Sequence, residues 1–173
     1  EKTKNKVNTH VRQIAKELVL LYAKREKSVG YAFSKDTPWQ KEFEDSFEYE
    51  LTDDQKQAIK EIKEDMESNK SMDRLLCGDV GYGKTEVAIR AAFKAVMDSK
   101  QVAYLVPTTV LSMQQYNTFK SRMEKFGINV EMLNRFRSAK RQKQIIKDLI
   151  DGKIDVLIGT HAILEENVVF KNL

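Results

Sequence analysis

Apolar residues recur at intervals of three and four along the first 26 residues of the chain. Val7, Val11, Ile14 and Leu18 fall on one side of such a helix, while charged and amide side chains fill the other side. This spacing predicts a long amphipathic helix over residues 1–26. An aromatic-rich arm follows at residues 31–47, with a short helix near residues 39–45. We expect this arm to pack against the domain that comes next.

From residue 51 onward, short apolar runs alternate with longer segments of helical periodicity. The runs predict buried strands at residues 74–77, 101–106, 128–133 and 154–158, and the longer segments predict helices at residues 53–68, 85–97, 110–126 and 138–150. Thr52 and Ser138 stand at N-cap positions, and Gly127 and Gly152 stand where helices end. Strands that alternate with crossover helices predict an α/β fold with a parallel sheet flanked by helices. The expected organisation is a helix and arm over residues 1–46, followed by one domain over residues 47–173.

The composition limits the classes of protein to which the chain can belong. Hydrophobic residues make up 41% of the 173 residues and charged residues 32%, with a net charge of +4, which is typical of a globular protein. The single cysteine, Cys77, excludes an intrachain disulfide, and we expect it to be a small core residue of its strand. One cysteine and two histidines make no convincing structural zinc site. No apolar run is long enough to cross a bilayer, so we expect a cytoplasmic protein with no membrane partner.

A phosphate-binding pattern lies between the first predicted strand and the helix after it. Residues 78–85 have the sequence GDVGYGKT, which fits G-x-x-x-x-G-K-[ST]. Glycines let such a loop curl until its backbone N–H groups face a phosphate, and the helix that follows adds its positive dipole end. Lys84 is suited to reach the β- and γ-phosphates, and the Thr85 hydroxyl is suited to hold Mg²⁺. The predicted nucleotide contacts here are Gly78, Asp79, Val80, Gly81, Tyr82, Gly83, Lys84, Thr85 and Glu86.

A candidate base-binding group precedes this loop. The amide of Gln55 carries a donor and an acceptor, which match the N6/N7 edge of adenine. Phe47 and Tyr49 lie just before it and are candidates to stack on the base. Taken alone, Gln55 is better explained as the partner of Thr52 in a capping box. Its place ahead of a phosphate loop increases the weight of the adenine-reading role.

Hydroxyl and basic side chains follow three of the predicted strands. They are Thr108 and Thr109, then Arg135 and Arg137, and finally Thr160 and His161. Because the carboxyl ends of parallel strands meet at one sheet edge, where ligands of α/β sheets bind, we expect these residues to line a single edge. They predict a track for a nucleic-acid backbone, bound without sequence preference. N-capping by the threonines and a structural hydrogen bond from His161 are the alternatives. The basic residues between positions 120 and 147 are, from charge alone, better explained as a solvated helix face.

These motifs, in this order, resemble the first motor lobe of superfamily 2 helicases and translocases. The resemblance is strongest to the bacterial transcription-repair coupling factors and covers essentially the whole chain. It rests on FEYE at residues 47–50, DDQ at 53–55, MDRLLCGDVGYGKTEVA at 72–88, LVPTT at 105–109, RFRS at 135–138 and IGTH at 158–161. The resemblance implies a RecA-like P-loop NTPase lobe. It also implies that the first helix is the relay segment between a polymerase-interacting domain and the motor.

The same resemblance implies an ATP-dependent translocase on double-stranded DNA, with ATP and Mg²⁺ as cofactors. By that likeness Lys84 and Thr85 bind phosphate and metal, and Gln55 reads adenine. The parent would displace stalled RNA polymerase and recruit excision-repair proteins through its other domains. By the same likeness, the chain stops before the strand with the Asp-Glu motif, and the second lobe with its arginine finger is missing. This piece alone is therefore expected to bind nucleotide weakly and to hydrolyse almost none.

Some positions depart from the family pattern, and other functions stay open. Glu48 and Asp53 replace common prolines, and Met113 and Gln115 stand where Gln and His are more usual, so no DNA contact is assigned to the last two. A RecG-like fork-remodelling helicase shares the motor plan but lacks the preceding segment. A P-loop small-molecule kinase would need an Arg-rich lid segment, which the sequence does not contain. A non-catalytic module that docks a partner through the helix and arm is the last alternative.

Overall fold

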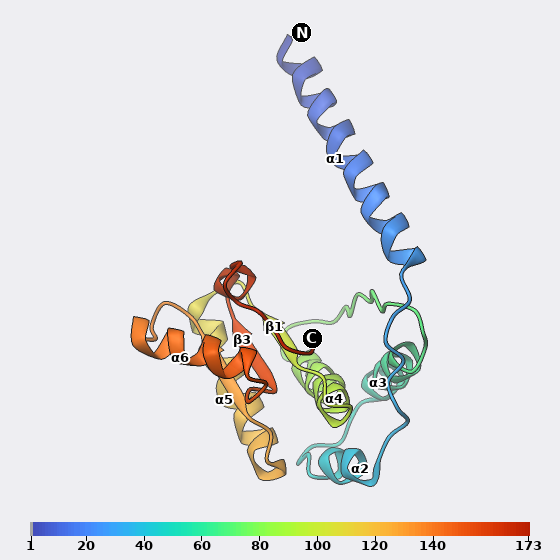
Figure 1. The fold of residues 1–173 in the computed structure, drawn as a ribbon. Helices are drawn as coiled ribbons and strands as arrows, with labels where there is room; N and C mark the ends of the chain where they lie inside the picture. Colours follow the sequence, from blue (N-terminus) through green and yellow to red (C-terminus); the bar gives the residue numbers. More distant parts are fainter. Residues whose placement is uncertain (1) are drawn as a thin grey trace.

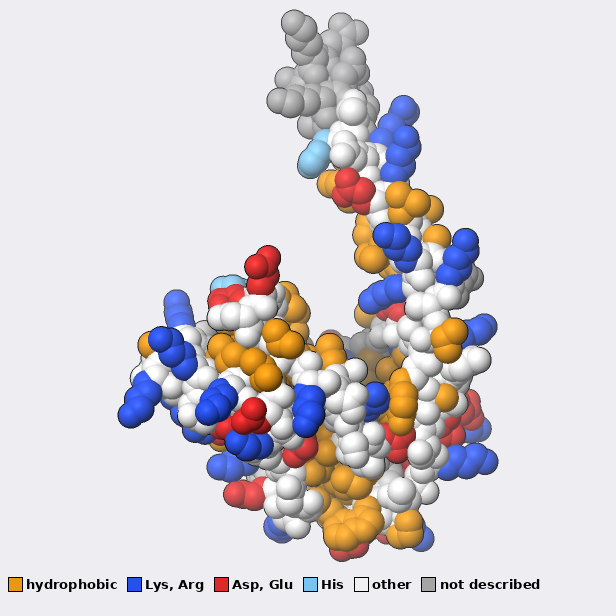
Figure 2. All heavy atoms as spheres, viewed as in Figure 1, with side chains coloured by type: hydrophobic (Ala, Val, Ile, Leu, Met, Phe, Trp, Pro, Cys, Tyr) orange, Lys and Arg blue, Asp and Glu red, His pale blue; other side chains and the backbone are white. Residues whose placement is uncertain are grey.

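A single long helix leads into the rest of the molecule. The computed structural model describes residues 2–173, with side chains for residues 9–25 and 27–173. Helix α1 (Lys2–Lys27) stands away from the other elements in Figure 1, and hydrophobic side chains are visible along it in Figure 2. Of the predicted stripe, Val11, Ile14 and Leu18 are 57%, 44% and 48% exposed, and Val7 lies outside the described side chains. The predicted helix is confirmed, and the described part of its apolar stripe remains solvent-accessible.

The aromatic arm packs against the core, as expected. Its short helix α2 (Pro38–Asp45) begins at Thr37, whose hydroxyl accepts a hydrogen bond from the backbone N–H of Gln40. Phe43 on α2 is fully buried and stacks on Phe93, with ring centroids 3.9 Å apart. Phe126 meets both rings edge-on. The arm therefore supplies a core side chain to the domain that follows it.

Three parallel strands form the sheet. They are β1 (Val102–Leu105), β2 (Val130–Leu133) and β3 (Val156–Gly159), in the order β1-β3-β2. Side chains alternate between the two faces of β3, so Val156 and Ile158 join one hydrophobic cluster and Leu157 joins another. The first cluster includes residues of α4 (Lys84–Met97) and α5 (Thr109–Met123), and the second includes residues of α6 (Ala139–Ile150) and the 3-10 turn His161–Leu164. The predicted α/β architecture, a parallel sheet flanked by helices, is confirmed.

Helix α3 (Asp53–Met66) packs on α4 and thereby lies near the phosphate loop (Figure 1). Its N-terminus carries the predicted capping box, because the N–H of Gln55 donates to the Thr52 hydroxyl and the N–H of Thr52 donates to Oε1 of Gln55. Ile62 and Met66 are buried against α4. The capping box fixes where α3 begins, and the buried face fixes how α3 sits on α4. Within the described residues, no helix is long and apolar enough to span a membrane.

The strand predicted at residues 74–77 is wrong, and so is the burial predicted for Cys77. These residues pair with no described strand; Leu75 is 86% exposed and Cys77 is exposed as well. The side chain of Arg74 is instead bonded to Asp65 and Glu61 on α3. A short apolar run forms a strand only where a neighbouring strand takes up its N–H and C=O groups, and this run has none within the described chain. The edge strand β1 also differs from expectation, because Leu105 is 54% exposed rather than buried.

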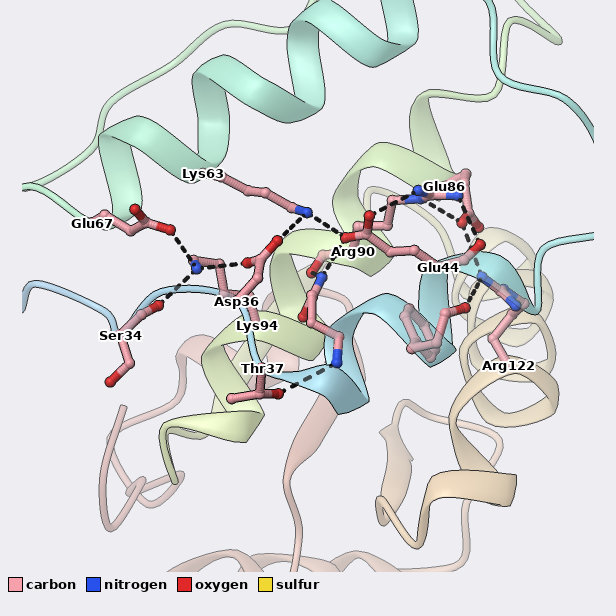
Figure 3. A network of polar contacts seen from close by, with 12 residues as sticks. Ser34, Asp36, Thr37, Glu44, Lys63, Glu67, Glu86, Arg90, Lys94 and Arg122 are labelled. Carbon is pink, nitrogen blue, oxygen red and sulfur yellow. Dashed lines mark hydrogen bonds and ion pairs between the residues drawn. The ribbon is translucent and has the colours of Figure 1, made fainter.

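A partly buried polar network ties the arm to α3 and α4 (Figure 3). The ammonium of Lys94, whose side chain is 3% exposed, donates to Asp36 at 2.9 Å, Glu67 at 2.8 Å and the Ser34 carbonyl at 2.7 Å. Lys63 bridges Asp36 and Glu44, at 2.6 Å from each. Buried charges persist when they are paired and hydrogen-bonded, so this network holds the arm in one position.

The network makes the stability of the fold fall as the pH becomes acidic. Burial raises the pKa of Asp36, but hydrogen bonds and charges from Lys63 and Lys94 outweigh it and hold the pKa below its usual value. A carboxyl with a lowered folded pKa stabilises the native state above its unfolded pKa, and this contribution is lost as the pH falls through the folded pKa. We therefore expect Asp36→Asn to lower the Tm at neutral pH, and the difference from the unsubstituted chain to shrink below about pH 4.

Thermal melts followed by circular dichroism between about pH 3 and pH 8 measure this effect across the titration range of carboxyl groups. Glu42→Gln, at an exposed position of α2, is the matched control. Its Tm should depend on pH in the same way as the Tm of the unsubstituted chain. A Tm difference for Asp36→Asn that stays the same at every pH would contradict the assignment.

Candidate nucleotide-binding site

The phosphate loop lies where the sequence predicts it, at the N-terminus of α4. Gly81 and Gly83 have φ angles of 84° and 65°, in the left-handed region that favours glycine. The loop curls around Lys84, whose Nζ donates to the carbonyl oxygens of Gly78 at 2.7 Å and Asp79 at 2.6 Å. A Cβ on Gly83 would lie 2.5 Å from Nε2 of Gln55, so any other residue there would also displace that amide.

The loop offers the donors that a phosphate needs. In the described part of the chain, the backbone N–H groups of Gly83, Lys84 and Thr85 bond to no acceptor. They are the unsatisfied donors of a helix N-terminus, where the helix dipole also favours an anion. Phosphate oxygens are stronger acceptors for an ammonium than neutral carbonyls are, so a bound phosphate would draw Lys84 away from the carbonyls of Gly78 and Asp79. The residues present therefore fit a nucleoside phosphate.

Glu86 serves the scaffold of this loop. Its side chain is 6% exposed, and one oxygen accepts from Arg90 at 2.9 Å and from Arg122 at 3.0 Å. Arg90 also pairs with Glu44 of the arm at 3.2 Å, so the network in Figure 3 reaches the residue next to Thr85. Arg122 belongs to the stretch that charge alone describes as a solvated face, yet it is mostly buried. Its role depends on partners distant in sequence, so no local pattern marks it.

Two further side chains approach Thr85 and were missed by the sequence reasoning. Nε2 of Gln115, on α5, lies 3.5 Å from Oγ1 of Thr85. Burial raises the pKa of Tyr104 on β1, and the Thr85 hydroxyl near it offsets only part of that increase. The alternation of side chains along β1 was a signal for Tyr104, because it turns that residue toward the helices that carry the site.

The candidate base-binding residues are brought together beside the loop. Phe47, Tyr49 and Gln55 line a surface cavity of about 510 Å³, together with residues 80–83. The rings of Phe47 and Tyr49 meet edge-on with centroids 5.6 Å apart. Nε2 of Gln55 donates to the Tyr82 carbonyl at 2.9 Å, while Oε1 serves the capping box. Both polar atoms of the amide thus have a partner within the protein, while one N–H of Nε2 and one lone pair of Oε1 stay available to a base.

Four of the six candidate DNA-binding residues meet at the carboxyl ends of the strands. A cavity of about 520 Å³ is lined by Thr109, Arg135, Thr160 and His161. Thr108 lies next to it and caps α5, since its hydroxyl accepts from the N–H of Leu111 at 3.2 Å.

Arg137 does not line this cavity and takes part in internal contacts instead. It lies 3.8 Å from Glu131, and its guanidinium stands 5.6 Å from the centre of the Tyr116 ring. Helix α6 carries the exposed lysines Lys140, Lys143 and Lys147. Figure 2 shows many basic side chains on the part of the molecule where α6 lies in Figure 1. The strand ends therefore form a polar edge, flanked by a basic helix.

Comparison with known proteins agrees with this geometry. The DEAD/DEAH box helicase family matches residues 52–173. The transcription-repair-coupling factors of Bacillus subtilis (strain 168) and Staphylococcus aureus (strain USA300) are 56% and 52% identical over all 173 residues, which span 15% of the length of each relative. A solved structure of RecG bound to a three-way DNA junction has a TM-score of 0.82 and 40% identity, and the match covers 88% of this chain and 21% of RecG. The chain therefore belongs to the DEAD/DEAH box helicase family, and along its whole length it resembles the transcription-repair-coupling factors.

Proposed function

We propose that the chain is the ATP-binding lobe of a translocase that moves along double-stranded DNA in transcription-coupled repair. The observation that carries this proposal is the phosphate loop, whose unbonded N–H groups and Lys84 lie next to an aromatic cavity. The relationship to transcription-repair-coupling factors supports the repair context. In this proposal residues 47–173 are the motor lobe, and residues 1–46 are a relay helix and packing arm.

Each residue of the site has a chemical task in this proposal. ATP supplies a phosphoanhydride bond whose hydrolysis releases energy, and Mg²⁺ neutralises the charge of its phosphates. Lys84 exchanges the loop carbonyls for phosphate oxygens, and the Thr85 hydroxyl holds the metal. Gln55 bonds the edge of adenine, while Phe47 or Tyr49 covers the face of the base. The buried network around Glu86 keeps α4 in place while the loop changes its bonds.

Duplex DNA is the proposed partner of the strand-end edge. Hydroxyls at helix N-termini and nearby arginines bind phosphates without reading sequence, and Thr108, Thr109, Arg135, Thr160 and His161 provide this combination. Arg137 would support the edge through Tyr116. RecG was solved bound to a DNA junction, which supports a DNA partner for this related chain. Stalled RNA polymerase and excision-repair proteins are the proposed partners of other parts of the complete protein, acting in the bacterial cytoplasm.

Nucleotide titration tests the proposal directly. We expect fluorescent ATP with Mg²⁺ to bind more tightly than fluorescent GTP, because the Gln55 amide matches adenine. Gln55→Ala should reduce this preference by roughly 5- to 100-fold, the range expected for one good bidentate contact to a base. Gln57→Ala is the matched control, since Gln57 lies on the exposed side of α3 and bonds only Glu61.

The outcomes of that titration separate the parts of the proposal. Equal affinity of the unsubstituted chain for ATP and GTP would remove the base-reading role of Gln55 and leave the phosphate loop. Failure to bind either nucleotide would contradict the proposed function as a whole. A kinase of small molecules is disfavoured because the helicase family matches most of the chain.

The similarity to RecG favours a second candidate, a helicase that remodels branched DNA. The two candidates differ in what the complete protein would move. Displacement of a stalled RNA polymerase without branch migration of a three-way junction would support the repair translocase. The opposite pair of results would support the RecG-like function.

A further inference from the structure

Two side chains outside the phosphate loop approach the hydroxyl of Thr85. Gln115 of α5 brings its amide nitrogen to 3.5 Å from the hydroxyl oxygen, and Tyr104 of β1 lies near enough for Thr85 to offset part of the pKa increase that burial causes. The other amide atom of Gln115, Oε1, is buried and has no hydrogen-bond partner in the described part of the chain. A buried carbonyl oxygen without a donor costs free energy, so native proteins seldom leave one without a reason.

The unpaired oxygen of Gln115 would gain a hydrogen-bond partner when the Thr85 hydroxyl binds Mg²⁺. A hydroxyl has one proton and two lone pairs, so Thr85 can accept from Gln115 while its own proton points elsewhere. Once a lone pair of Thr85 is committed to Mg²⁺, its proton needs an acceptor facing away from the metal. A half-turn of the Gln115 amide exchanges its nitrogen and oxygen, which are nearly identical in size. The turned amide would accept the Thr85 proton, so that the buried oxygen is no longer unpaired.

We infer that Gln115 is a positioning residue for the Mg²⁺-binding hydroxyl of Thr85. This inference rests on the proposed function and adds to it a group from α5, which the phosphate-loop pattern does not contain. Gln115 touches neither nucleotide nor metal in this assignment. It sets the direction of the Thr85 proton, and thereby the direction of the lone pair that Mg²⁺ uses.

The test is a Mg²⁺ titration of nucleotide binding by the 173-residue chain, with fluorescent ADP as the probe. Gln115→Met keeps the length of the side chain and removes both polar atoms. We expect it to raise the Mg²⁺ concentration needed for half-maximal binding by about 3- to 10-fold, which corresponds to one hydrogen bond of the usual strength. Affinity measured in EDTA, where no Mg²⁺ is present, should stay within about twofold, because the phosphate contacts are unchanged.

Two further variants make the readout specific. Gln115→Glu keeps the shape and an acceptor oxygen and adds a negative charge, so its Mg²⁺ requirement should be no higher than that of the unsubstituted chain. Gln114→Met is the matched control, since Gln114 is the neighbouring, exposed amide on α5. If Gln115→Met does not fold, Gln115→Glu alone decides. A higher Mg²⁺ requirement for Gln115→Glu than for the unsubstituted chain would then overturn the inference.

The remaining outcomes separate this inference from the proposed function. Equal Mg²⁺ requirements for Gln115→Met and the unsubstituted chain would overturn the inference and leave the nucleotide site intact. An equal loss of affinity with and without Mg²⁺ would also overturn it, because that result describes a structural residue. If the unsubstituted chain bound no nucleotide, the proposed function would fail first and the inference with it.

Discussion

Replacing Lys84 with alanine is expected to lower the affinity for ATP·Mg²⁺ by about 10- to 100-fold. The Lys84 ammonium is the charged group around which the phosphate loop is wrapped, bonded to the carbonyls of Gly78 and Asp79. Hydrogen bonds to charged groups contribute about 1.5–3 kcal/mol, and each 1.4 kcal/mol changes a dissociation constant about tenfold. Isothermal titration calorimetry of the unsubstituted chain and the variant measures the difference.

The control for this experiment is Lys60→Ala on the exposed side of α3, which removes the same charge away from the loop. Its affinity for ATP·Mg²⁺ should stay within about twofold, because a single surface charge has a small effect at physiological salt. Unchanged binding by Lys84→Ala would contradict the assignment of the phosphate site. Equal losses in both variants would mean that net charge, rather than the loop, holds the nucleotide.

Replacing Phe43 with alanine is expected to lower the free energy of unfolding by about 3–5 kcal/mol. Phe43 comes from the arm, yet it is fully buried and stacked on Phe93 of α4 at 3.9 Å. The substitution removes the apolar area of the ring and leaves a cavity between α2, α4 and α5. Urea unfolding followed by circular dichroism measures the change, with the midpoint expected to fall at nearly constant slope.

Trp39→Ala is the control for this prediction, because Trp39 is a large aromatic residue of the same helix that is 56% exposed. Its effect should be less than about 1 kcal/mol. If Phe43→Ala were as mild as Trp39→Ala, the arm would be attached to the surface only, and the chain could be divided near residue 46 without loss of the core. A large effect makes the arm part of the folding unit.

Several elements were determined by the sequence alone, because their causes lie within a few residues. The capping box of Thr52 and Gln55 starts α3, and Gly127, with a φ of 72°, ends the turn after α5. The phosphate loop also has a local signature, since its glycines at positive φ and the helix that follows lie within residues 78–97. The helices, three of the four predicted strands and the position of Lys84 and Thr85 therefore followed from short-range patterns.

Other features were decided only by the tertiary structure, because each needs a partner distant in the chain. The apolar run at residues 74–77 has strand character but no neighbouring strand, and Arg74 is held by α3 instead. Arg122 belongs to a basic stretch, yet it is mostly buried beside Glu86. Gln115 is one of two adjacent glutamines, and only the packing of α5 against α4 distinguishes it by bringing it to Thr85. Local propensity acts through neighbouring bonds, whereas strand pairing, burial of charge and contact with a distant hydroxyl depend on long-range packing, which no short window of the sequence contains.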